Sequence, residues 1–133
     1  MSKPTPKPAK INYDEIPWNV VVGSSEKLRI RRLITRGRHG AELMLGVASL
    51  GPGVETGWWS SMPEDEGLGV YWMGPVEETY YCTQGQLTLS TDDGEIEFGP
   101  NDAIYLAPGN HYKLKNTGDE TAYFIYNLYP PRE

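Results

Sequence analysis

Short apolar and alternating segments recur along this chain every eight to twelve residues and are separated by turn residues. Alternation with a period of two is typical of half-buried β-strands. The predicted strands cover residues 19–22, 28–34, 42–50, 79–83, 86–90, 95–98, 103–107, 112–115 and 122–128. Asp93-Gly94, between two of them, is the strongest hairpin signal. No helix longer than one or two turns is predicted, so the pattern favours a β-sandwich or barrel.

The length and composition agree with a single β domain. The chain has 133 residues with 15 Gly and 11 Pro, too many turn residues for a helical bundle of this size. Residues 1–10 alternate Pro and Lys without hydrophobic periodicity, which predicts a disordered N-terminal arm. Residues 11–133 are predicted to form one domain. Within it, the acidic and Gly-rich segment 62–70 should form a loop at one mouth of the barrel.

The charge is unevenly distributed. Residues 1–40 carry nine Lys or Arg and three Asp or Glu, whereas residues 41–133 carry three and fifteen. Most of the chain would repel phosphates, so we expect no nucleic-acid partner. No apolar run approaches the ~18 residues that span a bilayer, and the first residues lack the apolar segment of a secretory signal. We therefore expect a cytoplasmic protein without a membrane partner.

The basic residues concentrate in segment 27–38, where Lys27, Arg29 and Arg31 alternate with apolar residues. One interpretation is a solvated strand face or a protected edge strand. Another is that this strand meets the acidic remainder of a second subunit. The second interpretation predicts a two-fold homodimer with residues 20–36 in or beside the interface.

Two segments carry a family resemblance. Residues 75–85, Pro-Val-Glu-Glu-Thr-Tyr-Tyr-Cys-Thr-Gln-Gly, resemble the Glu-x6-Gly end of the first cupin motif. Residues 99–116 resemble the second motif, in which Gly and Asp are followed by Pro-Gly, a histidine and an Asn. The resemblance covers roughly residues 41–129. It implies an all-β, cupin-type double-stranded β-helix, or jelly-roll barrel. Cupins include many enzymes, binding modules and storage proteins, so the fold does not fix the function.

The usual metal ligands of cupins are missing. Metal-binding cupins supply His-x-His and Glu from the first motif and His from the second, a set suited to transition metals. The chain has two histidines, His39 and His111. The resemblance places Trp59 or Trp72 where the first motif has its first ligand histidine. It places Tyr112 where the second motif has its ligand histidine. We therefore expect an activity that needs no metal or other cofactor.

The resemblance places Glu78 inside the barrel, and strand alternation directs Tyr80 and Cys82 to the same face. A carboxyl group among aromatic rings loses hydration, which should raise its pKa and suit it to acid-base catalysis. Tyr112, near the opposite wall, could donate a proton or a hydrogen bond to a substrate oxygen. Glu78 and Tyr112 are thus the predicted catalytic residues. The predicted substrate-binding residues are Tyr80, Cys82, Trp59 and Trp72.

These residues predict a small-molecule enzyme of isomerase, dehydratase or lyase type. Three alternatives stay open. One is a divalent transition metal held by Glu78, Tyr105 and His111, which requires a bulge near residues 108–110 to turn the histidine inward. Local similarity to ectoine synthase favours a metal, whereas similarity to the ethanolamine-utilisation cupin favours its absence. The others are a non-catalytic module that binds a small aromatic or cationic molecule, and a barrel in which the tyrosines are packing residues only.

Overall fold

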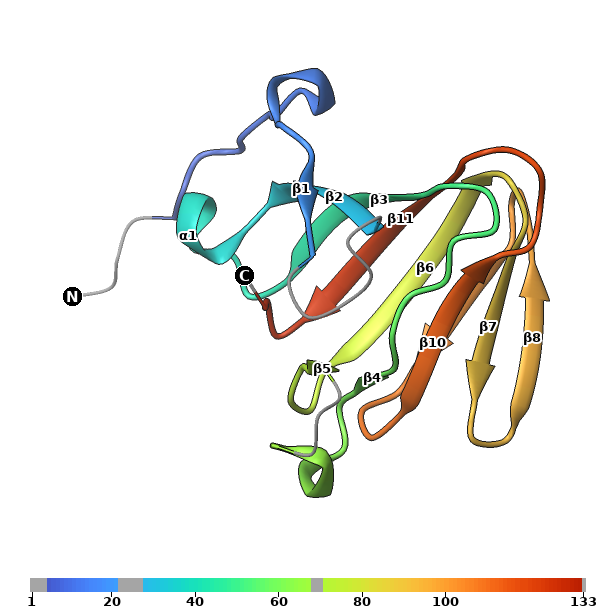
Figure 1. The fold of residues 1–133 in the computed structure, drawn as a ribbon. Coiled ribbons are helices and arrows are strands. Elements are labelled where there is room, and N and C mark those ends of the chain that lie inside the picture. Colours follow the sequence, from blue (N-terminus) through green and yellow to red (C-terminus); the bar gives the residue numbers. More distant parts are fainter. Residues whose placement is uncertain (1–4, 22–27, 68–70, 133) are drawn as a thin grey trace.

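The computed structural model describes residues 5–21, 28–67 and 71–132, and these residues form two facing β-sheets (Figure 1). One sheet has the order β1 (Asn19–Val20), β2 (Leu28–Ile34), β3 (Met44–Leu50), β11 (Ala122–Tyr129), β6 (Glu77–Gln84) and β9 (Ala103–Leu106). The other has the order β5 (Tyr71–Trp72), β4 (Trp59–Ser60), β10 (His111–Asn116), β7 (Leu87–Thr91) and β8 (Gly94–Phe98). The predicted all-β jelly-roll barrel is confirmed.

The strands follow the predicted pattern. Each of the nine predicted strands matches an observed one, with ends that differ by at most two residues. The predicted hairpin joins β7 and β8, where Thr91 lies opposite Gly94 and the glycine has φ of 133°. Residue 22 of the first predicted strand, residues 1–4 of the predicted arm and residues 68–70 of the predicted loop lie outside the described residues.

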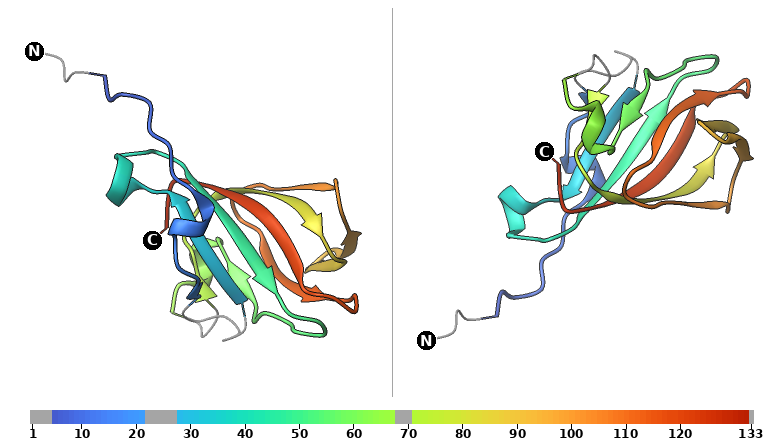
Figure 2. Two further views of the ribbon diagram at one scale, coloured as in Figure 1. Left: turned by 90° about the horizontal axis from the view of Figure 1, so that it is seen from above. Right: turned by 90° about the horizontal axis from the view of Figure 1, so that it is seen from below.

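Short helical segments lie outside the barrel wall: η1 (Tyr13–Glu15), α1 (Arg36–His39) and η2 (Pro63–Asp65). Residues 5–10 are exposed and run away from the domain (Figure 2). The described helices include none that is long and apolar enough to cross a membrane.

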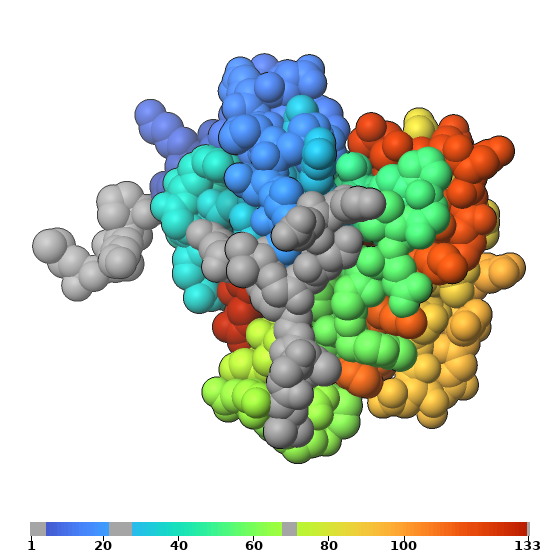
Figure 3. All heavy atoms as spheres, in the orientation of Figure 1, coloured from blue at the N-terminus to red at the C-terminus, as the bar shows by residue number. Residues whose placement is uncertain are grey.

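The N-terminal segment packs against β2, as the space-filling view shows (Figure 3). Arg31 holds it there, because its guanidinium lies 4.1 Å from the ring centroid of Tyr13 and 4.5 Å from that of Trp18. The same side chain donates to the Tyr13 carbonyl oxygen over 3.0 Å and lies 3.6 Å from a carboxylate oxygen of Asp14. This basic residue therefore has partners within its own chain.

The core lies between the two sheets. Strand alternation builds it, since every second residue of β3 and β11 is buried. The largest fully buried side chains include Met44, Leu50, Leu87, Leu89, Phe98 and Leu114. Towards the end of the barrel at which β6 begins, this packing leaves a cavity.

Candidate active site

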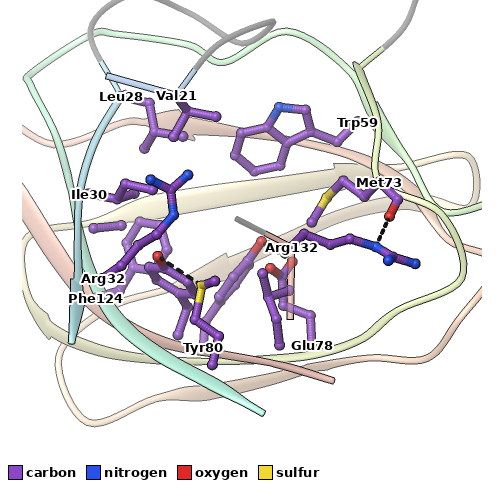
Figure 4. Close-up of a pocket in the computed structure, with 14 residues that line it drawn as sticks. Val21, Leu28, Ile30, Arg32, Trp59, Met73, Glu78, Tyr80, Phe124 and Arg132 are labelled. Atoms are coloured by element: carbon purple, nitrogen blue, oxygen red, sulfur yellow. Dashed lines mark hydrogen bonds between the residues drawn. The ribbon is translucent and has the colours of Figure 1, made fainter. Parts of the chain in front are cut away.

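The cavity is mainly apolar (Figure 4). Its apolar walls include Leu28, Ile30, Ala48, Trp59 and Phe124. Its polar lining residues are Arg32, Glu78, Tyr80, Tyr126 and Arg132. The cavity has a volume of about 60 Å³. A mainly apolar space with a few polar groups is typical of a small-molecule site.

Strand β6 places Glu78 at the wall of this cavity. The side chains of Glu78, Tyr80 and Cys82 point inward and are only 5%, 2% and 0% exposed. Glu77 and Tyr81 lie on the opposite, exposed face. The inward orientation, expected for Glu78 from the resemblance and for Tyr80 and Cys82 from alternation, is observed for all three residues.

Two tyrosine hydroxyls hold the Glu78 carboxyl group. Tyr80 donates to its Oε1 atom over 2.6 Å, and Tyr112 donates to the same atom over 2.5 Å. Tyr80 comes from the same strand, whereas Tyr112 comes from β10 of the facing sheet. Both bonds use Oε1, and the described residues provide no hydrogen bond to Oε2. The second oxygen is therefore the one available to a molecule in the cavity.

This environment changes the acidity of Glu78. Burial raises its pKa from the ordinary 4.5 to about 7, although the hydrogen bonds from Tyr112 and Tyr80 act in the opposite direction. Burial and the neighbouring carboxyl also raise the pKa of Tyr80 well above its usual value. Tyr80 therefore stays a hydrogen-bond donor at neutral pH, while Glu78 is present in both protonated and ionised forms.

Tyr112 has a different position from the one predicted for a substrate contact. It is buried, but it is not among the residues that line the cavity. Its hydroxyl contacts Glu78 and lies 3.3 Å from the Met73 sulfur, and its ring meets Trp59 edge-on at 5.4 Å. Tyr112 therefore positions Glu78, and the Trp59 ring lies between Tyr112 and the cavity, which both Trp59 and Glu78 line.

Two of the predicted substrate-binding residues are not at the cavity. The indole of Trp72 donates to the carbonyl oxygen of Met62 over 3.1 Å, away from the lining residues. Cys82 points inward but lies too deep in the core, where its thiol is 3.4 Å from the Gln84 carbonyl oxygen. Burial also raises the pKa of this thiol. Neither Trp72 nor Cys82 therefore lines the cavity, whereas Tyr80 and Trp59 do.

The alternative metal ligands are not brought together. Tyr105 is 60% exposed and donates to Glu77 on the outer face of the sheet. His111 lies opposite Ser60 in regular register and pairs with Asp92 at 3.0 Å, so no bulge turns it inward. Both residues are thus separated from the carboxyl group of Glu78.

The donor set at the cavity does not fit a transition metal. Around Glu78 it consists of one carboxyl group and two phenols, one of them behind the cavity wall, that already donate hydrogen bonds to that carboxyl group. Across residues 5–21, 28–67 and 71–132, no cluster of three or more His, Cys, Asp or Glu side chains is arranged to hold a metal ion. The chemistry that this cavity supports is therefore that of its own side chains.

Sequence reasoning missed three polar residues of the cavity, Arg32, Tyr126 and Arg132. Arg32 follows Leu28 and Ile30 at the next inward-facing position of β2, and Tyr126 is at an inward-facing position of β11. A charged residue at an inward position of a strand was the available signal.

A family model for the cupin domain matches residues 58–127, which is more than half of the chain. The chain belongs to the cupin family. An uncharacterized protein of Methanocaldococcus jannaschii is 31% identical over 55 residues, which cover 41% of this chain and 44% of that protein. The chain thus spans less than half the length of this relative.

Solved cupin structures share the whole fold. The polyketide cyclase RemF from Streptomyces resistomycificus superposes with a TM-score of 0.74 at 18% identity, covering 95% of this chain and 82% of that one. A predicted oxalate decarboxylase from Thermotoga maritima gives 0.73 at 14%, covering 92% and 100%. A putative ethanolamine utilization protein Q from Salmonella typhimurium gives 0.70 at 12%, covering 92% and 86%. At these identities the likeness shows the fold alone.

Proposed function

We propose that this cupin is an enzyme that moves a proton to or from a small organic substrate in the barrel, with Glu78 as the acid-base group. One observation carries the proposal: a buried carboxyl group, held by two phenols on one oxygen, borders a mainly apolar cavity with its other oxygen unbonded among the described residues. A pKa of about 7 suits such a group to general acid-base catalysis at neutral pH.

The arrangement suggests how the proton transfer would work. In its ionised form, Glu78 takes a proton from the substrate on Oε2, while the hydroxyls of Tyr80 and Tyr112 stabilise the negative charge on Oε1 beforehand. In its protonated form, Glu78 returns the proton to another atom of the substrate or to a leaving group. The apolar walls exclude water and so strengthen these interactions.

This chemistry fits isomerisation, dehydration or lyase reactions. In each of them a base removes a proton from carbon, and the same acid delivers it elsewhere, so one carboxyl group suffices. The fold is shared with a protein described as a polyketide cyclase, which supports the use of such a barrel for catalysis on small molecules.

Product formation by purified variants tests the proposal. A panel of small organic acids, ketones and phenols is incubated with wild type in D₂O, and NMR records product and deuterium incorporation. Glu78→Gln keeps the side-chain shape without the titrating group, so turnover should fall by a factor on the order of 10² to 10⁴. Tyr112→Phe, which leaves the carboxyl group in place, should lower turnover less.

Glu77→Gln is the matched control, because this exposed neighbour lies on the other face of the same strand. It should keep wild-type turnover. Unchanged turnover in Glu78→Gln would remove Glu78 from the mechanism. Binding without any reaction on the whole panel would instead favour a non-catalytic, small-molecule-binding cupin.

A further inference from the structure

Packing of the barrel core does not explain why Arg32, a charged residue, occupies an inward position of β2. Leu28 and Ile30 precede it in the inward phase of β2 and are both buried in the core. The guanidinium of Arg32 then projects towards the cavity beside Ile30 (Figure 4). Its Nε atom is buried without a hydrogen-bond partner, and no described carboxylate forms an ion pair with it. A half-buried cation without a counter-charge is unfavourable unless a ligand supplies one.

The sheet places a tyrosine hydroxyl on the same side of the cavity as this cation. Arg32 lies opposite Gly46 of β3, and Gly46 lies opposite Tyr126 of β11. A Cβ atom on Gly46 would be 2.4 Å from the Cζ and Oη atoms of Tyr126. The ring therefore lies over Gly46, and its hydroxyl reaches across β3 towards β2 and Arg32.

The Tyr126 hydroxyl can donate a hydrogen bond to a ligand. The only acceptor found for it among the described residues is the sulfur of Met44 at 3.8 Å, and a thioether is a weak acceptor. Burial raises the pKa of Tyr126 even though Arg32 acts in the opposite direction, so the phenol keeps its proton. It can therefore donate a hydrogen bond to an anion that Arg32 binds.

We propose that Arg32 and Tyr126 form a carboxylate-binding subsite, and that the substrate is a small organic acid with an apolar or aromatic body. A guanidinium matches a carboxylate with two parallel hydrogen bonds. One half-buried guanidinium balances the single charge of a carboxylate better than the double charge of a phosphate. The second arginine at the cavity, Arg132, is exposed and donates to the backbone oxygen of Met73.

The subsite would also orient the substrate towards Glu78. Tyr126 and Tyr80 lie opposite one another, and Glu78 occupies the next inward position along β6. A molecule anchored by its carboxylate at Arg32 would extend its body past Tyr80 towards the carboxyl group of Glu78. In this respect the inference rests on the proposed function, since both groups would act on one substrate.

Binding of defined probes tests the subsite without any turnover. Phenylacetate, its neutral analogue phenylacetamide and phenyl phosphate are titrated into the full-length protein by calorimetry. We expect phenylacetate to bind at least ~10-fold more tightly than the amide, because hydrogen bonds between two charged groups are stronger than those to a neutral amide. Arg32→Gln should abolish this preference, and Tyr126→Phe should weaken phenylacetate binding several-fold.

Arg29→Gln is the control, since it removes an exposed arginine from the outer face of the same strand. It should bind phenylacetate like wild type. Arg32→Gln should also melt at or above the wild-type temperature, because it removes an unpaired charge; a purely structural arginine would predict a loss. If that variant does not fold, Arg32→Lys replaces it and should bind phenylacetate more weakly while still preferring it to the amide.

Several outcomes would overturn the subsite: equal affinity for phenylacetate and its amide, wild-type affinity in Arg32→Gln, preference for phenyl phosphate, or no binding of any probe at millimolar concentration. Glu78→Gln separates this test from that of the proposed function. It should keep the preference for phenylacetate even though turnover is lost. Suppose that Glu78→Gln loses turnover but wild type shows no preference for phenylacetate over the amide. The subsite would then be refuted, while the acid-base role of Glu78 would stand.

Discussion

Replacing Glu78 by Gln should change how the stability of the protein depends on pH. In the unfolded chain the carboxyl has the ordinary pKa of 4.5, whereas burial raises it to about 7 in the folded state. Between these values the folded protein retains a proton that the unfolded chain releases. The free energy of unfolding therefore falls as pH rises, by about 1.4 kcal/mol per pH unit. Over the whole interval the contribution is about 3 kcal/mol, present below pH 4.5 and lost above pH 7.

Urea unfolding at a series of pH values, followed by tryptophan fluorescence, measures this contribution. The other titrating groups are common to both proteins and cancel in the difference between wild type and Glu78→Gln. That difference should shift by about 3 kcal/mol in favour of the variant between pH 4 and pH 8. Glu77→Gln, whose carboxylate is exposed, should show no comparable shift. A constant difference between wild type and Glu78→Gln would refute the reasoning, because it would mean that folding leaves the acidity of Glu78 unchanged.

Three further predictions concern packing, assembly and metal content. Gly46→Ala puts a methyl group 2.4 Å from a tyrosine ring and should destabilise the fold by about 1–3 kcal/mol in urea unfolding; Gly57→Ala, with open space around it, should not, and equal effects would contradict this. We propose a two-fold homodimer with residues 20–36 in or beside the interface, weakened by Arg29→Glu; sedimentation as a monomer at all practical concentrations would exclude it. Protein purified without an affinity tag should hold well under one equivalent of transition metal and stay active in chelator, whereas stoichiometric metal bound through Glu78 would overturn the proposed chemistry.

Much of the fold follows from local pattern. Nine strands could be predicted because each lies in a short apolar or alternating run between turn residues; the two residues of β1 lie in the apolar run 19–22. Strands β4 and β5 have two residues each, too few for a period to be visible. They form through pairing with β10 and with one another, which is a property of the assembled sheet.

Less of the site could be predicted. The family resemblance placed Glu78 inward and alternation placed Tyr80 on the same face, and both residues line the cavity. Alternation also directed Cys82 inward, but Cys82 lies too far along the barrel to line the cavity. The position of an inward residue along the barrel axis, or its depth, determines whether it lines the cavity. The contact of Tyr112 with Glu78 joins strands of different sheets, and the contact of Tyr126 with Gly46 depends on the register of β3 and β11. Neither the depth nor the register can be obtained from a local pattern.

Infrared difference spectroscopy of wild type against Glu78→Gln titrates the carboxyl group directly, because a protonated carboxyl has a C=O stretch that the ionised form lacks. We expect this band to be half lost at a pH of about 7. In Tyr112→Phe the midpoint should move higher, since a hydrogen bond that stabilises the charged form is removed. A midpoint near the ordinary value of 4.5 would contradict the acid-base role assigned to Glu78.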